Sequence, residues 1–141
     1  MSGDDRSRVT IHVDGAARGN PGPAAIGAII ADLDGTPRVK VSSYIGEATN
    51  NQAEYRALIV GLREAAVLGA RYVDVYSDSQ LLVEQVMGNY RVRNAGLKPL
   101  FEEAMQLLEQ FESYTMMHVP RRQNTDADAL ANAAFKARHG H

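Results

Sequence analysis

The sequence predicts an α/β fold in which helices cover a single mixed β-sheet. Three strand-like segments come first and are joined by short turns, so they should pair antiparallel. Helical and strand-like segments then alternate through the rest of the chain. Strands separated by helices should be parallel and joined by right-handed crossovers. We therefore expect the element order βββαβααβα.

The first third of the sequence predicts a three-stranded antiparallel unit. Residues 9–14 alternate branched apolar side chains with others, which indicates a strand. Residues 15–23 are dense in glycine, asparagine and proline, which is typical of a turn. A buried strand over 26–33 and a further strand over 36–46 should flank Asp34-Gly35, a tight hairpin signal.

After this unit the apolar residues change to helical spacing. A helix is expected over 52–69, with Thr49 or Asn50 as its cap and Gly69 at its end. The remaining elements should be a strand over 72–77, a helix over 79–87, a polar connection over 88–96, a helix over 97–111, a strand over 114–119 that stops at Pro120, and a helix over 125–138.

Composition limits the class of protein. A length of 141 residues suits one domain, which we assign to 1–141, with frayed ends at 1–7 and 139–141. The chain has 0 cysteines, so any metal must be bound by oxygen or imidazole, and a cytoplasmic location is expected. No apolar run reaches about 18 residues and the start lacks the apolar core of a signal peptide, so no membrane partner is expected. The net charge of -2 argues against a broad basic surface for nucleic acid, unless divalent cations neutralise several acids.

Glu54 is an acidic residue that helix periodicity does not explain. It lies four residues before Leu58 and eight before Leu62, on the stripe that should face the sheet. A carboxylate in that place is costly unless it is paired or binds a cation. The structural alternative is an ion pair with a lysine or arginine at the edge of the stripe.

Three aspartates occupy comparable positions. Asp14 should end the first strand, Asp78 follows the fourth, and Asp128 lies in the first turn of the last helix. Each also has an ordinary explanation, namely a turn cap for Asp14, a helix cap for Asp78 and the helix dipole for Asp128. Carboxylates clustered together with Glu54 would repel one another unless cations neutralised them. Hard oxygen ligands select Mg²⁺ or Mn²⁺, and two such ions about 4 Å apart suit displacement at phosphorus.

Most other acids need no such explanation. Four of them should lie on a solvated helix face: Glu102, Glu103, Glu109 and Glu112. The glycine-rich segment 15–23 lacks the Gly-Lys-Ser/Thr ending of a P-loop, which excludes a nucleotide hydrolase of that type.

Four motifs in this order resemble the type 1 ribonuclease H family over nearly the whole chain. They are Asp14-Gly15 with 19–23, the segment 49–58, the segment 77–79, and Asn124 with 127–132. The resemblance implies a ribonuclease H-like fold, with a five-stranded mixed sheet in the order 3-2-1-4-5 and strand 2 antiparallel to the rest. It also implies an endonuclease that hydrolyses the RNA strand of RNA–DNA hybrids.

The resemblance assigns roles to individual residues. Asp14, Glu54, Asp78 and Asp128 correspond to the catalytic carboxylates that bind two Mg²⁺ ions, with Mn²⁺ as a possible substitute. One ion would activate the attacking water and the other would stabilise the leaving 3′-oxygen, giving 5′-phosphate and 3′-hydroxyl ends. Further residues would contact the substrate: Gly15, Asn20, Thr49, Asn50, Asn51, Gln52, Ser79 and Asn124. Amide side chains can hold the 2′-hydroxyls of RNA, although turn and cap chemistry is the alternative explanation for them.

The chain departs from the best-known bacterial members in two ways. It lacks a basic protrusion, since residues 88–98 offer only Arg91, Arg93 and Lys98 as cations. The loop before the last helix also has no histidine, and we hypothesise that Arg121 or Arg122 assists phosphate binding or product release instead.

The histidines outside this loop do not suggest a replacement. His12 should be core or half-buried and His118 a structural strand residue, while His139 and His141 should lie roughly 15–20 Å from Asp128.

These departures resemble a compact subgroup found in archaea and some bacteria, in which the domain is sometimes fused to another. Some members of that subgroup also cut double-stranded RNA. A nuclease of the same fold that acts on double-stranded RNA, or a non-catalytic module that binds hybrids, are the alternative functions.

Overall fold

The structure is a computed structural model that describes residues 7–139. The ends that the sequence predicts to be frayed lie mostly outside the described residues. Within them, the carbonyl oxygen of Ser7 accepts a hydrogen bond from the backbone N–H of Arg71 at 2.7 Å. The first described residue is therefore anchored, and the last helix extends to His139.

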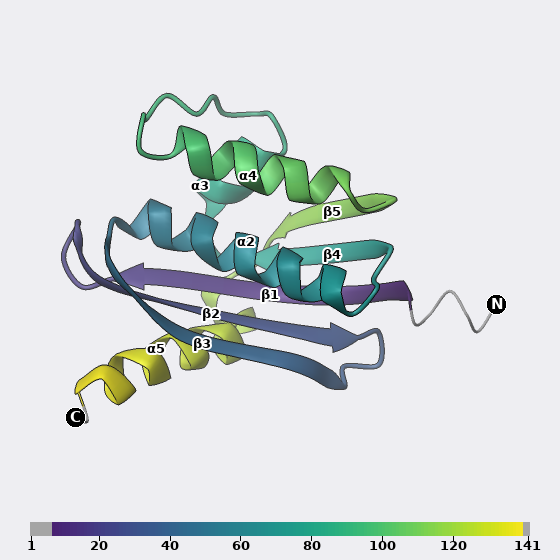
Figure 1. The fold of residues 1–141 in the computed structure, drawn as a ribbon, viewed down its shortest axis with the longest axis horizontal. Helices are drawn as coiled ribbons and strands as arrows, with labels where there is room; N and C mark the ends of the chain where they lie inside the picture. Colours follow the sequence, from purple (N-terminus) through teal and green to yellow (C-terminus); the bar gives the residue numbers. More distant parts are fainter. Residues whose placement is uncertain (1–6, 140–141) are drawn as a thin grey trace.

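The strands form one mixed sheet in the order β3-β2-β1-β4-β5, as expected (Figure 1). They are β1 (Arg8–Ala17), β2 (Gly22–Asp32), β3 (Pro37–Ala48), β4 (Tyr72–Ser77) and β5 (Ser113–His118). β2 runs antiparallel to β1 and β3, whereas β4 is parallel to both β1 and β5. The predicted antiparallel start and parallel continuation of the sheet are therefore confirmed.

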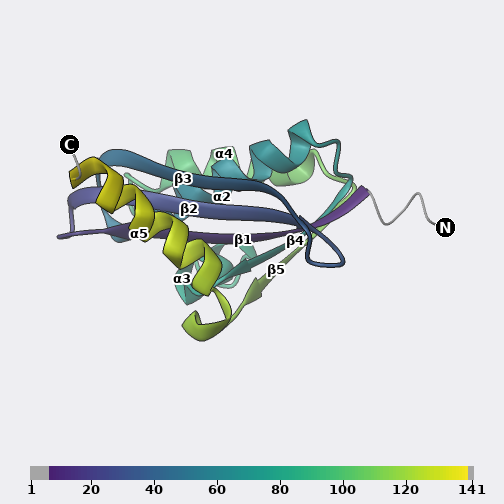
Figure 2. The same cartoon turned by 90° about the horizontal axis from the view of Figure 1, so that it is seen from below.

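Helices cover both faces of the sheet (Figure 2). They are α2 (Asn50–Val67), α3 (Gln80–Val86), α4 (Lys98–Glu109) and α5 (Thr125–His139), with a short 3₁₀ turn at Arg121–Gln123 before α5. The predicted helices therefore form, each with its ends within two residues of the expected position. None of the helices in the described part of the chain is long and apolar enough to cross a membrane.

Two neighbouring residues of β2 show that α2 and α5 lie on opposite faces. Gly61 of α2 packs against the side chain of Ala28. A Cβ added to the preceding residue, Gly27, would lie 2.1 Å from the carbonyl oxygen of Ala127 in α5. Because consecutive strand residues point to opposite faces, the two helices enclose the sheet from both sides. The absence of a side chain at Gly27 lets α5 lie directly on the sheet.

The hairpin between β1 and β2 differs from the prediction. β1 does not end at Asp14 but continues to Ala17, which pairs with Ala24 of β2. The turn is therefore confined to residues 18–21, and Gly22 and Pro23 already belong to β2 because they pair with β3. The composition correctly predicted a turn here, but the strands on both sides extend into the segment, so the turn is shorter than expected. As a result, Asp14 lies within the strand rather than at its end.

Candidate metal centre

Asp14 and Asp78 meet where β1 and β4 separate. Pairing between these parallel strands ends at Val13 opposite Ser77, and the two aspartates are the next residues along each strand. β1 nevertheless stays paired with β2 through Asp14 and Gly27, so the backbone of Asp14 remains fixed. A point where neighbouring strands diverge at their carboxyl ends is a frequent ligand site in α/β sheets.

Gly15 brings the third carboxylate to this point. A Cβ on Gly15 would lie 2.3 Å from both the carbonyl carbon and oxygen of Ala53 in the first turn of α2. Only glycine therefore allows α2 to approach β1 so closely. The backbone N–H of Gly15 donates a hydrogen bond to Oε1 of Glu54 at 2.7 Å, which orients that carboxylate.

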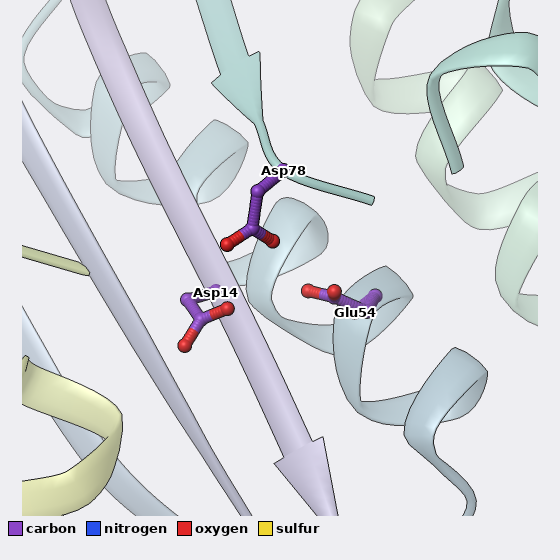
Figure 3. Close-up of side chains that lie close together, drawn as sticks. All are labelled: Asp14, Glu54 and Asp78. Carbon is purple, nitrogen blue, oxygen red and sulfur yellow. The ribbon is translucent and has the colours of Figure 1, made fainter. Parts of the chain in front are cut away.

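The three carboxylates converge on one place (Figure 3). One carboxylate oxygen from each of Asp14, Glu54 and Asp78 lies within 4.8 Å of the other two, and these three are the only such group among residues 7–139. Asp128 does not belong to this group. It lies close enough to Asp14 to raise the pKa of that carboxyl group, and Nδ2 of Asn132 donates to its Oδ2 at 3.3 Å. The structure therefore brings three of the four predicted carboxylates together and leaves Asp128 outside the group.

The electrostatics of this cluster favour uncharged carboxyl groups. Burial, together with the charges of Asp78 and Asp128, raises the pKa of Asp14 to about 8. Burial also raises the pKa of Glu54 above its ordinary range, as do the charges of Asp14 and Asp78, while the Gly15 N–H and Arg121 oppose this rise.

One buried carboxylate oxygen of the cluster has no hydrogen-bond partner. Oδ2 of Asp78 is buried, and Nε of Arg121 lies 3.9 Å away, which is an ion pair but not a hydrogen bond. An unsatisfied oxygen among carboxylates that repel one another when ionised is suited to bind a cation.

The segment that begins α2 shows cap chemistry at the residues expected to contact substrate. Thr49 caps α2 through its Oγ1, which accepts from the N–H of Gln52 at 3.1 Å, while Oε1 of Gln52 accepts from the N–H of Thr49 at 2.9 Å. Oδ1 of Asn50 accepts from Ala17 N–H at 2.8 Å, and Oδ1 of Asn20 accepts from Asn50 N–H at 3.0 Å. These bonds join the β1–β2 hairpin to α2. Substrate contact by them and by the exposed Asn51 stays a prediction.

Asn124 and Ser79 also have structural partners. Asn124 is 1% exposed, and its Nδ2 donates to the carbonyl oxygen of Val13 at 2.8 Å. Its own carbonyl oxygen accepts from Asp128 N–H at 3.1 Å, so Asn124 connects the start of α5 to the residue before Asp14. Ser79 caps α3 by accepting from Leu82 N–H at 3.2 Å. The sequence motif identified Asn124 as important, but its tertiary contact with β1 had no signal in the sequence.

His12 and His118 lie as the sequence indicated. His12 is half-buried and stacks on Tyr76 with ring centroids 4.8 Å apart, and burial lowers the pKa of its imidazole. His118 is the last residue of β5 and is exposed. His141 lies outside the described residues.

Comparisons with known proteins place this fold in a known class. A family model described as "Reverse transcriptase-like" matches residues 12–134. The N-terminal RNase H domain of Rv2228c from Mycobacterium tuberculosis is 46% identical, with a TM-score of 0.88 over 90% of this chain and 98% of that one. RNase H1 from Halobacterium salinarum is 43% identical, with a TM-score of 0.90 over 92% of this chain and 98% of that one. LC11-RNase H1, solved with an RNA/DNA hybrid, is 39% identical, with a TM-score of 0.88 over 92% and 98% of the two chains.

Fold and acidic centre thus define a domain of the ribonuclease H type. The chain belongs to the ribonuclease H family, and the solved structures that it matches at about 40% identity or more include an RNase H domain and RNase H1 proteins. It spans 36% of the length of the full mycobacterial protein, which is named "Bifunctional protein Rv2228c", and 66% of the curated Halobacterium "Ribonuclease HI".

Proposed function

We propose that this chain is an endonuclease that hydrolyses the RNA strand of RNA–DNA hybrids. In this proposal two divalent cations take part, and the products carry 5′-phosphate and 3′-hydroxyl ends. The observation that carries it is the group of Asp14, Glu54 and Asp78, whose carboxylate oxygens lie within 4.8 Å of one another. The likeness to LC11-RNase H1, whose structure contains an RNA/DNA hybrid, supports the choice of substrate.

The donor set fits a hard divalent cation. Asp14, Glu54 and Asp78 offer only carboxylate oxygens, which suit Mg²⁺ or Mn²⁺ better than softer metals. These three would hold the ions, and Asp128 would join them from α5. When bound, such cations supply charge neutralisation and Lewis acidity at the phosphate.

The protein's own contribution is to hold these groups in place. The strand pairing of β1, the cap of α3 and the Gly15–Glu54 hydrogen bond fix the three carboxylates before substrate arrives. Arg121 extends beside Asp78 with its side chain 82% exposed, so its guanidinium can meet a phosphate at the edge of the centre. The asparagines at the hairpin and at the start of α2 would contact the sugars of the RNA strand.

Double-stranded RNA is the second substrate that the site could accept, because amides that hold 2′-hydroxyls would also meet them there. A non-catalytic hybrid-binding module would be expected to lack one of the acidic residues, and all four are present. A cytoplasmic location stays a prediction.

A labelled-substrate assay tests this proposal. The chain is incubated with an RNA–DNA hybrid, a double-stranded RNA or a DNA duplex of one sequence, with Mg²⁺, with Mn²⁺ or with EDTA. We expect metal-dependent cuts within the RNA of the hybrid, and fragments that a 3′-ligation reaction accepts without end repair. Cleavage that persists in EDTA, or cleavage of the DNA duplex alone, would contradict the proposal.

A further inference from the structure

Two arginines are held on aromatic rings at one corner of the molecule, away from the carboxylates. The guanidinium of Arg18, in the β1–β2 hairpin, lies 4.2 Å from the ring centroid of Phe135. The guanidinium of Arg138, in the last turn of α5, lies 5.3 Å from the ring centroid of Tyr44. Both arginines are exposed, whereas Phe135 is 2% exposed. We call Arg18, Tyr44, Phe135 and Arg138 the hairpin–helix corner.

The corner is one continuous surface. Phe135 packs in an apolar cluster with Ala25 and Ala134, and Tyr44 packs against the same cluster. The two arginines therefore flank a shared apolar base formed by β2, β3 and α5. Figures 1 and 2 both place the β1–β2 hairpin and the end of α5 at the same end of the molecule.

Four arginines of the described residues lie over an aromatic ring, and Arg18 and Arg138 differ from the other two, Arg8 and Arg71, in their partners. Arg8, Arg38, Arg63, Arg71 and Arg121 each lie within 4.0 Å of a carboxylate oxygen. Within residues 7–139, neither Arg18 nor Arg138 forms such an ion pair. A guanidinium stacked on a ring keeps its N–H edge available, and here no carboxylate of the described residues occupies that edge. The corner thus offers two oriented donors to an anion from outside.

The corner is connected to the metal centre by rigid elements. The hairpin that carries Arg18 is tied to the start of α2 through Asn50 and Asn20. On α5, Arg138 follows Asp128 by ten residues, which is about 15 Å along a helix at 1.5 Å per residue. A duplex advances about 3.4 Å per base pair, so this length corresponds to about four base pairs.

We propose that Arg18 and Arg138 bind the phosphate backbone of the substrate duplex about four base pairs from the cleaved bond, on one side of it only. The proposal rests on the proposed function for the identity of the duplex. Guanidinium–phosphate contacts carry no base information, so the corner strengthens binding equally for all sequences. The corner would increase affinity by contacting the part of the duplex that extends to one side of the cleaved bond, and it would leave the rate of the chemical step unchanged.

Salt dependence of binding gives the first test. In a cleavage-deficient Asp14→Asn background, Arg18 and Arg138 are both changed to Met, whose unbranched chain still covers the rings. Affinity for a labelled hybrid is measured by fluorescence anisotropy at several salt concentrations. Two lost phosphate contacts should reduce the slope of log affinity against log salt by about 1.8. The background protein should therefore lose about tenfold more affinity than the double variant between roughly 50 and 200 mM salt.

A charge-matched control separates local contact from overall charge. The double variant Arg38→Met, Arg63→Met removes the same charge from arginines that are paired with Asp32 and Glu103 and do not belong to the hairpin–helix corner. This control should keep the original slope. An unchanged slope in the corner variant would mean that the two arginines only cover their rings, and an equal fall in both variants would mean a general charge effect. Either result would overturn the proposal.

The length of the duplex arms gives the second test. Hybrids are prepared with an arm of roughly two or roughly eight base pairs on each side of a single cleavable position, lengths that fall short of or pass the corner. In the protein with Asp14 intact, the corner variant should raise KM several-fold only when one particular arm is long, and kcat should stay constant. Equal effects on both arms would contradict the proposal. If the unaltered protein cleaves no hybrid at all, the proposed function fails, whereas the binding slopes still decide the role of the corner.

Discussion

The two ends of the β1–β4 strand pair handle charge in opposite ways. At the amino-terminal end, Nη1 of Arg8 lies 3.0 Å from Oδ1 of Asp74, and Thr115 donates to the same oxygen at 2.9 Å. At the carboxyl-terminal end, Asp14 and Asp78 face each other and Glu54, and the ion pair with Arg121 is 3.9 Å long. At one end of the strand pair, Asp74 has a cation and a hydroxyl group as partners. At the other end, the acidic residues face mainly one another.

This difference distinguishes a structural ion pair, Arg8 with Asp74, from a candidate metal-binding site. An exposed or half-exposed ion pair adds little to stability, with a median of about 0–1 kcal/mol, but it needs nothing from outside the protein. A group of buried carboxylates costs stability unless protons or cations neutralise it. The carboxylates stay together despite this loss of stability because strand pairing and the close approach of α2 at Gly15 hold their backbones in place.

Neutralising one acid at each end should give the largest contrast. Asp14→Asn removes a charge from the cluster at nearly constant shape, and we expect hybrid cleavage to fall by about 10³-fold or more, equivalent to about 4 kcal/mol of transition-state stabilisation. Asp74→Asn, at the paired end, should change cleavage less than about twofold. Both rates are measured under single-turnover conditions with Mg²⁺ and with Mn²⁺.

The fold of the Asp14→Asn protein serves as the control. Without metal it should be at least as stable as the unaltered protein, because the folded state no longer has to hold a proton on Asp14 that the unfolded chain releases. Strong cleavage by this variant with either metal would end the proposed mechanism. Unfolding of the variant at ambient temperature would show instead that Asp14 is needed for the fold.

Gly15→Ala should break the cluster by separating its elements. The added Cβ would lie 2.3 Å from Ala53 and 2.5 Å from the backbone nitrogen of Glu54, so α2 must move away from β1. Overpacking of this kind costs about 1–3 kcal/mol, and the displaced Glu54 should lower cleavage as well.

Gly35→Ala is the matched control for this change. It introduces no contact within 4 Å and strains only a turn with φ of +89°, so it should destabilise by about 1–2 kcal/mol without a loss of activity. Urea unfolding and cleavage rates of both variants are compared. Full activity in Gly15→Ala would show that the close approach does not position Glu54.

Much of this architecture could be predicted because it follows from local patterns. Apolar periodicity gave the element order, and the motifs around Asp14, Glu54 and Asp78 indicated a shared site. What the patterns could not show are contacts between distant segments. The extension of β1 to Ala17 depends on pairing with β2, and the place of Asp128 outside the group depends on how α5 crosses Gly27.

The stability of the metal-free protein should depend on pH through the carboxyl groups of the cluster, Asp14 and Glu54. The pKa of Asp14 is about 8 in the folded protein, whereas an unperturbed aspartate has a pKa of 3.8, so between these values the folded state keeps a proton that the unfolded state has released. Stability must therefore fall as pH rises from about 4 to about 8, by at most about 1.4 kcal/mol per pH unit for one group. The raised pKa of Glu54 acts in the same direction.

Urea unfolding in EDTA at pH 5 and pH 7.5 checks this dependence. Asp14→Asn should flatten it, whereas Asp74→Asn should leave it unchanged, because only the first belongs to the cluster. Saturating Mg²⁺ should also flatten it by favouring the deprotonated carboxylates. A metal-free protein that is more stable at pH 7.5 than at pH 5 would contradict the electrostatic description of the cluster.

The smallest expected effect concerns the two arginines of the loop before α5, which the sequence could not tell apart. Arg121 lies beside Asp78, whereas Arg122 lines a separate cavity with His12 and Asp126. Arg121→Ala should therefore lower kcat/KM by about three- to tenfold, the value of one exposed phosphate contact of roughly 1 kcal/mol, and Arg122→Ala should change it less than twofold. Steady-state kinetics on one hybrid distinguish the two variants. An equal loss in both would mean that the loop acts through its overall charge, and unchanged kcat and KM in the double variant would remove the loop from the mechanism altogether.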